Sequence, residues 1–176
     1  MLKNKAIKIF LLLLLIIIIV FPLFIFKVQT LQINNFSFKK TKTIWQKKVK
    51  NGDSFSIKYI HSVAKTPVIE FFEINDGKIL LTGTEYQSYG AGLPTSTEGN
   101  YILKNDKFII KNIDQFLPEI LLRVSDYAEH EFIYKNHSLK LYEEVKTETL
   151  LQFRTEKICY FRFYYKEVLK WLKKNI

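Results

Sequence analysis

The sequence has very few of the residues that build cross-linked or metal-bound structures. Its single cysteine, Cys159, cannot form an internal disulfide, and a cysteine-rich zinc site is impossible. It has no G-x-S-x-G motif, which excludes the nucleophile elbow of the α/β-hydrolases. At 176 residues it is too short for a dinucleotide-binding domain plus a substrate domain, or for a barrel of eight strand–helix units. Its 48% hydrophobic content excludes a disordered protein and fits one modest domain with an anchoring segment.

A long apolar run near the N-terminus predicts a membrane anchor. Residues 9–26, IFLLLLLIIIIVFPLFIF, carry no charge, and about twenty helical residues cross the hydrocarbon core of a bilayer. The alternative is a cleaved signal peptide, but the run exceeds the usual apolar length and no A-x-A-like site follows it. We therefore expect residues 1–30 to form a retained, single-pass anchor in the cell membrane.

The distribution of charge predicts the orientation and limits the partners. Lys3, Lys5 and Lys8 precede the apolar run, which favours a cytoplasmic N-terminus and an extracytoplasmic location for the bulk of the chain. Of the net charge of +10, residues 31–50 carry +6, residues 51–145 carry −5 and residues 146–176 carry +5. The basic charge thus flanks the domain, whereas a nucleic-acid-binding protein more often carries it on the folded core. We expect no nucleic-acid partner; the flanks lie near an anionic membrane surface or are simply solvated.

Alternating apolar and polar residues predict a mainly β fold. In SFSIKYIH, residues 54–61, one face of a half-buried strand carries Phe55, Ile57, Tyr59 and His61. Asn75-Asp76-Gly77 predicts a turn after the next strand, and Gly83 marks a bulge or a close approach of two strands. About eight short strands are expected, at 54–61, 68–74, 79–89, 101–104, 108–113, 120–125, 131–134 and 139–145.

These strands predict a small antiparallel β-sandwich or open barrel over residues 51–145. Residues 31–50 are expected to be a basic linker and the start of the first strand. Residues 146–176 are expected to be a basic amphipathic tail, with a helix over 160–176. Such a helix usually docks on a sheet and covers an edge; the alternative is that it lies on a membrane surface.

His61 and Glu70 are the main candidates for a polar site. If strands 54–61 and 68–74 pair as a hairpin, Tyr59 lies near Glu70, and His61 lies diagonal to Glu70. Glu70 shares its face with apolar residues, so its carboxylate is expected to be partly buried and to need a partner. This arrangement predicts either a structural His–Glu pair or a pocket in which His61 acts as a base or a ligand contact.

The sequence gives less support to a catalytic site or a metal site than to this polar site. His61 and Ser62 are adjacent and cannot both project from one face of a strand, which argues against a Ser/His/Glu triad. Glu129-His130-Glu131 alternates faces, which argues against a metal site that combines these residues with His61 or His137. The G-A-G-L-P segment at 90–94 is too short for a phosphate-binding loop. It predicts a tight strand exit, or a loop whose backbone approaches a ligand or partner chain.

Several motifs together resemble an uncharacterised bacterial family, domain of unknown function 1850. YIHSVAKTPVIEFFEI (59–74) and TEYQSYGAGLP (84–94) are similar to its H-S-V, T-P-V, Glu and G-A-G-L-P pattern, and the resemblance covers roughly residues 45–145. The resemblance implies a small membrane-anchored or exported protein. It also implies a gene often found beside a tripartite (TRAP) transporter with a TAXI-type solute receptor. No catalytic role is established for the family, so none is carried over.

Three functional hypotheses follow. The first is a non-catalytic, membrane-anchored extracytoplasmic accessory protein of a TRAP-type (TAXI) transporter, which would contact the transporter's membrane subunit or its solute-binding protein. The second is a module that binds a small ligand or peptide near His61, Glu70 and the 90–94 loop, and the third is an enzyme of unknown reaction. We predict no catalytic residue, metal or cofactor. The expected ligand or partner contacts are His61, Ser62, Thr66, Glu70, Tyr89, Gly90, Gly92 and Pro94.

Overall fold

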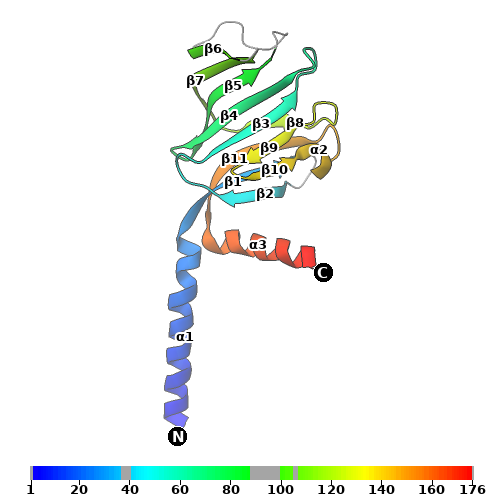
Figure 1. Ribbon diagram of the computed structural model, residues 1–176. Coiled ribbons are helices and arrows are strands. Elements are labelled where there is room, and N and C mark those ends of the chain that lie inside the picture. The colour runs from blue at the N-terminus through cyan, green and yellow to red at the C-terminus, as the bar shows by residue number, and fades with distance from the viewer. Residues whose placement is uncertain (1, 37–40, 88–99, 105–106, 176) are drawn as a thin grey trace. The chain divides into compact units, whose positions relative to one another are not determined.

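A computed structural model describes residues 2–36, 41–87, 100–104 and 107–175 (Figure 1). These residues form a mainly β fold with two antiparallel sheets, an N-terminal apolar helix and a C-terminal helix, which confirms the predicted fold class. The chain divides into two compact units. One comprises residues 31–156, and the other comprises residues 1–30 together with residues 157–176.

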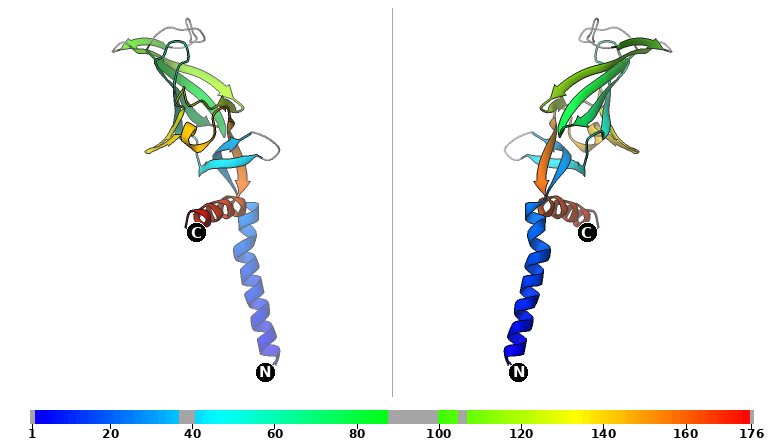
Figure 2. Two further views of the ribbon diagram at one scale, coloured as in Figure 1. Left: turned by 90° about the vertical axis from the view of Figure 1, so that its right-hand side faces the viewer. Right: turned by 90° about the vertical axis from the view of Figure 1, so that its left-hand side faces the viewer.

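The larger sheet has seven strands in the order β10-β9-β3-β4-β5-β7-β6 and appears as a twisted layer in Figures 1 and 2. Its strands are β3 (Ser54–Ile60), β4 (Pro67–Asn75), β5 (Lys78–Tyr86), β6 (Asn100–Lys104), β7 (Lys107–Leu117), β9 (Glu131–Tyr134) and β10 (His137–Lys140). The smaller sheet has four strands in the order β2-β1-β11-β8. Its strands are β1 (Lys27–Asn35), β2 (Lys42–Lys48), β8 (Ile120–Arg123) and β11 (Leu150–Cys159).

The smaller sheet is built largely from segments that the sequence analysis assigned to a linker and a tail. β1 and β2 occupy most of residues 27–48, and β11 begins only five residues into the expected tail. Residues 31–34 of β1 and 151–154 of β11 alternate apolar and polar residues, and the apolar ones are completely buried: Leu31, Ile33, Leu151 and Phe153. The lysines of residues 39–50 suggested a solvated linker. Burial of these apolar side chains nevertheless stabilises β1 and β11 in the sheet.

The segment 139–145 also differs from the strand that the sequence predicts there. β10 ends at Lys140, and a short helix, α2 (Leu141–Glu144), replaces most of the expected strand. The backbone N–H of Leu141 donates to the carbonyl of His130, and that of Val145 donates to the carbonyl of Leu141. This turn places the Leu141 side chain in the core, where it is fully buried.

The turns and the bulge follow the sequence signals. Asp76 and Gly77 have φ of 48° and 68°, and they join Asn75 to its ladder partner Lys78 as a tight two-residue turn. The ladders on both sides of β5 change register next to Gly83. A Cβ atom on Gly83 would lie 2.6 Å from the carbonyl oxygen of Ile110, so the predicted close approach is confirmed.

The main core of the β unit contains side chains from both sheets. Phe132 of β9 lies at its centre, with its ring centroid 4.8 Å from Trp45, 5.6 Å from Phe55 and 5.7 Å from Phe153. A second, smaller cluster consists of the buried residues Val68, Tyr86 and Ile110 with partly buried neighbours.

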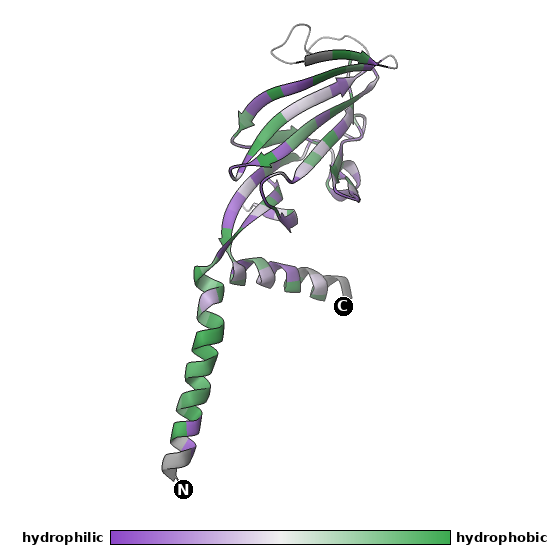
Figure 3. Cartoon of the chain, turned by 60° about the vertical axis from the view of Figure 1, so that its left-hand side comes forward, coloured by the Kyte–Doolittle hydropathy of each residue, from purple (hydrophilic) through white to green (hydrophobic). Residues whose placement is uncertain are grey.

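The other unit contains α1 (Leu2–Ile25) and α3 (Tyr160–Asn175). The stretch Ile7–Ile25 of α1 has nineteen residues and is long and apolar enough to cross a membrane (Figure 3). None of this stretch is buried. A signal sequence near an N-terminus has the same properties, so this helix is either an anchor or a signal. The backbone N–H of Tyr160 donates to the carbonyl of Phe26 over 3.1 Å, which joins the beginning of α3 to the end of α1.

Candidate functional site

Glu70 lies in the middle of the larger sheet, on the face that points into the core. It is opposite Ile57 of β3 and Thr84 of β5. Along β4, the buried positions are Val68, Phe72 and Ile74, which alternate with more exposed ones, so Glu70 shares their inward face as predicted.

A row of mostly aromatic residues runs beside Glu70 on this face. Tyr59, Val68, Tyr86 and Phe108 are opposite one another across four strands, and the rings of Tyr86 and Phe108 stack with centroids 5.4 Å apart. We call the surface formed by Tyr59, Val68, Glu70, Thr84, Tyr86 and Phe108 the Glu70 face.

The carboxylate of Glu70 is half-buried in this apolar setting. Burial raises the pKa of Glu70. Burial and the nearby charge of Glu70 raise the pKa of Tyr59 to about 12. Among the described residues, the structure shows no hydrogen bond or ion pair to the Glu70 carboxylate. A half-buried charge without a partner lowers stability, so Glu70 is poorly suited to a purely structural role.

Replacing Glu70 by glutamine is expected to raise the free energy of unfolding at pH 7 by on the order of 1 kcal/mol. The folded state has the higher pKa, so it favours the protonated carboxyl, and ionisation destabilises the fold as pH rises through that pKa. The gain should therefore disappear at acidic pH, as urea unfolding at several pH values would show. Glu73→Gln, on the opposite face of β4, should change stability by less than about 0.5 kcal/mol. A Glu70→Gln protein that is less stable than wild type at pH 7 would contradict this reading.

His61 does not contact Glu70 as predicted, because the hairpin register differs by two residues. Tyr59 is opposite Val68, and Ile57 is opposite Glu70. His61 lies beyond the end of β3, four residues from Ile57, which places it roughly 13 Å along the strand from Glu70's partner. The predicted His61–Glu70 pair is therefore wrong. Ile57 is directly opposite Glu70, and Tyr59 lies diagonal to it on the same strand.

The side chain of His61 instead closes the loop between β3 and β4. Its Nδ1 accepts hydrogen bonds from the backbone N–H groups of Val63 (3.3 Å) and Ala64 (3.1 Å). The backbone N–H of His61 donates to the carbonyl of Thr66, and the backbone carbonyl of His61 accepts from the N–H of Lys65, which has φ of 57°. The loop has six residues, 61–66, as many as the expected loop 62–67, but it begins one residue earlier. This shift moves the pairing of β3 with β4 by two residues.

We predict that His61→Ala lowers the free energy of unfolding by about 1–2 kcal/mol, because two backbone donors lose their acceptor. His61→Asn should recover most of this loss, since the asparagine Oδ1 can replace the acceptor Nδ1. Thermal unfolding of both variants measures the difference. If His61→Ala and His61→Asn are equally destabilised, the acceptor Nδ1 of His61 does not stabilise the loop.

The other predicted contacts fall into two groups. Ser62 is exposed in the same loop as His61, and Thr66 closes that loop with its carbonyl while its Oγ1 is buried without a hydrogen-bond partner among the described residues. The structure thus gathers His61, Ser62 and Thr66 at one end of the β3–β4 hairpin and leaves Glu70 apart. The remaining four positions lie outside the described residues: Tyr89, Gly90, Gly92 and Pro94.

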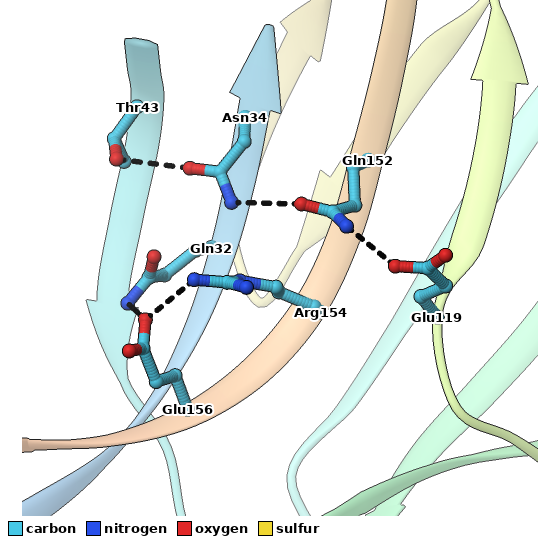
Figure 4. Close-up of polar contacts among 7 residues, drawn as sticks. All are labelled: Gln32, Asn34, Thr43, Glu119, Gln152, Arg154 and Glu156. Carbon is cyan, nitrogen blue, oxygen red and sulfur yellow. Dashed lines mark hydrogen bonds and ion pairs between the residues drawn. The ribbon is translucent and has the colours of Figure 1, made fainter. Parts of the chain in front are cut away.

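The sequence analysis missed a polar layer on the smaller sheet (Figure 4). The buried amides of Asn34 (β1) and Gln152 (β11) are joined, with Asn34 Nδ2 donating to Gln152 Oε1 over 3.4 Å. Thr43 Oγ1 donates to Asn34 Oδ1 over 2.9 Å, and Gln152 Nε2 donates to Glu119. The alternation of apolar and amide residues in L-Q-I-N (31–34) could have identified this layer.

A second part of the layer surrounds Glu156. Gln32 Nε2 donates to Glu156 Oε2 over 3.1 Å, and an Arg154 guanidinium nitrogen donates to the same oxygen over 2.9 Å. The Gln32–Glu156 bond joins β1 to β11, whereas the Arg154–Glu156 bond lies within β11. The layer therefore helps to fix the pairing of β1 with β11.

The histidine and acidic residues do not assemble a metal centre in the part of the chain that the structure describes, where no group of three or more His, Cys, Asp or Glu side chains converges. His130 is nearly buried, and its Nδ1 accepts a hydrogen bond from the Ser125 N–H over 3.2 Å. Burial lowers the pKa of His130, so the neutral ring is favoured in a structural role.

Comparison with protein families identifies the central segment of the chain. Residues 55–141 match the family described as Domain of unknown function (DUF1850). Neither the curated proteins nor the solved structures gave a match. The matched DUF1850 segment begins in β3 and ends at the first residue of α2. It therefore contains the larger sheet, almost complete, and β8, whereas β1, β2 and β11 of the smaller sheet come from the flanking residues.

Proposed function

We propose that this protein is a non-catalytic accessory protein that α1 anchors in the cell membrane. The observation that carries the anchor is the Ile7–Ile25 segment, whose apolar side chains are all outside any protein core. Exposing such a surface to water is strongly unfavourable, and a bilayer covers it without further protein contacts.

We place the β unit on the extracytoplasmic side, because Lys3, Lys5 and Lys8 precede the span. Two C-terminal fusions test this orientation: alkaline phosphatase, active only outside the cytoplasm, and green fluorescent protein, fluorescent only inside it. We expect an active phosphatase and a dark fluorescent protein, with the intact chain retained in membranes after a carbonate wash. A soluble chain shortened by about thirty residues would show a cleaved signal and would contradict the anchor.

The partner we propose is a TRAP-type transporter with a TAXI-type solute receptor, either its membrane subunit or its solute-binding protein. The match of residues 55–141 to DUF1850 and the motif resemblance over residues 59–94 support this assignment. Purification of the tagged protein from membranes at native expression should enrich that transporter. A matched control carries residues 1–30 fused to an unrelated domain. Equal recovery of the transporter with both baits would contradict the proposal.

One observation favours a second function, the binding of a small ligand or peptide at the Glu70 face. Glu70 keeps a half-buried carboxylate beside Tyr59 without a partner among the described residues, although this arrangement lowers stability. A carboxylate in such a setting binds ammonium groups and other strong donors best. Amines and basic peptides should raise the melting temperature of the wild type but not of Glu70→Gln, since binding to the folded state stabilises it. No shift with any ligand, or an equal shift in both proteins, would argue against this site.

A further inference from the structure

The C-terminal helix α3 divides into an apolar half and a basic half. At 3.6 residues per turn, one half of its circumference carries Phe161, Tyr164, Tyr165, Val168, Leu169, Trp171 and Leu172. The sequence places five basic residues and one acidic residue on the other half, together with Phe163: Arg162, Lys166, Lys170, Lys173, Lys174 and Glu167.

The apolar half of α3 is exposed. Tyr164, Val168 and Trp171 on this half are 54%, 54% and 64% exposed. The sequence analysis favoured docking of this half on the sheet, and its alternative was the surface of a membrane.

Contacts with α1 show which way this apolar half faces. Phe161, at its centre, stacks on Phe24 of α1 with ring centroids 4.5 Å apart and planes inclined by 20°. Phe24 belongs to the apolar stretch Ile7–Ile25, so the apolar half of α3 faces the same side as the proposed membrane span. The helix runs across the axis of α1 rather than along it in all three views (Figures 1 and 2).

We propose that α3 lies in the surface of the membrane that α1 spans, with its apolar half among the acyl chains and its basic half against anionic phospholipid headgroups. This inference rests on the proposed membrane anchor. It adds a lipid-binding surface at the C-terminus, outside the segment that matches DUF1850.

The residue types of α3 suit this position. Tyrosine and tryptophan rings, such as Tyr164 and Trp171, are enriched at the boundary between headgroups and acyl chains. Lysine and arginine side chains bury their apolar stems and reach toward the headgroups, where anionic lipids attract them. The excess of four positive charges in residues 160–175 provides that attraction.

Trp171 gives a direct test in the full chain, which contains only one other tryptophan, Trp45 in the β unit. The protein is reconstituted in vesicles of phosphatidylcholine and phosphatidylglycerol, in which part of the phosphatidylcholine is brominated on the upper acyl chain. Bromine quenches only tryptophans in contact with lipid. We expect a loss of emission in the wild type and little loss in Trp171→Phe, which retains only Trp45.

Two substitutions at neighbouring positions test the two halves of α3 separately. Val168→Lys adds a lysine to the apolar half and should reduce the quenching of Trp171. Glu167→Lys adds the same residue to the basic half and should leave the quenching unchanged or increase it. Both variants should float with the vesicles, because α1 is intact.

The outcomes distinguish this inference from the proposed anchor. Flotation without quenching of Trp171 would overturn the position of α3 and leave the anchor standing. An unquenched, blue-shifted Trp171 with cross-links between copies would show that a second copy of this chain covers the face, and would also overturn it. A chain that does not float would contradict both proposals, because neither α1 nor α3 would then be bound to the vesicles.

Discussion

Replacing Phe153 by alanine is expected to lower the free energy of unfolding by about 3–5 kcal/mol. Phe153 is completely buried in β11, and its ring lies 5.7 Å from that of Phe132 at the centre of the core. The substitution removes a large apolar side chain and leaves a cavity between the two sheets, where neighbouring side chains can relax only partly. Urea unfolding in detergent micelles, followed by near-ultraviolet circular dichroism, measures the loss.

The matched control is Phe116→Ala in β7, where the side chain is 54% exposed. It should cost less than about 1 kcal/mol, because little apolar area returns to water. Phe153 lies outside residues 55–141, so a large loss would show that the segment matching DUF1850 depends on its flanking strands. Similar losses in the two variants would contradict the assignment of β11 to the core.

Replacing Asp53 by alanine is expected to cost about 2–4 kcal/mol at pH 7. Asp53 Oδ2 accepts hydrogen bonds from the Lys50 N–H (3.0 Å) and the Tyr134 hydroxyl (3.2 Å), and Oδ1 lies 3.4 Å from Lys135 Nζ. Burial alone would raise the pKa of Asp53, but these three donors outweigh it, so the pKa is lowered from 3.8. Without the carboxylate, the buried Tyr134 hydroxyl and the Lys50 N–H have no acceptor.

The stabilisation that Asp53 contributes should decrease as the pH falls. The folded state has the lower pKa, so the stabilisation is complete above the unfolded value of 3.8 and is lost as pH falls through the folded pKa. Urea unfolding from pH 7 to pH 2 should therefore show that the difference in free energy of unfolding between wild type and Asp53→Ala becomes smaller in acid. Asp53→Asn, which keeps one acceptor oxygen, should be intermediate. Lys135→Met should lower the free energy of unfolding much less than Asp53→Ala does, because the lysine side chain is 57% exposed. A gap that widens in acid would contradict this account.

The candidate site was only partly predictable from sequence. Alternation along residues 68–74 placed Glu70 among apolar neighbours, and the structure confirms that inward face. The partner of Glu70 was predicted wrongly because it depends on the register of β3 against β4. The six-residue loop closed by His61 sets that register, and strand periodicity carries no information about the conformation of such a loop.

The smaller sheet shows a second limit of sequence reasoning. Gln32 and Glu156 bond across 124 residues of sequence, and β1 pairs with β11 at the two ends of the β unit. Local patterns could have shown that L-Q-I-N and L-Q-F-R are strands. They could not show that these strands lie side by side, because pairing at that separation depends on the core that both strands bury.

The amino-acid sequence by itself determined the apolar helix, the inward faces of β3 and β4, and the tight turn at Asn75–Lys78. These features depend on neighbouring residues, whose spacing fixes side-chain direction and whose φ preferences fix the turns. Only the tertiary structure decided that Ile57 lies opposite Glu70, that the flanking segments complete the second sheet, and that Phe161 of α3 stacks on Phe24 of α1. Each of these depends on which distant surfaces meet, and the free energy of that contact is not a property of any local segment.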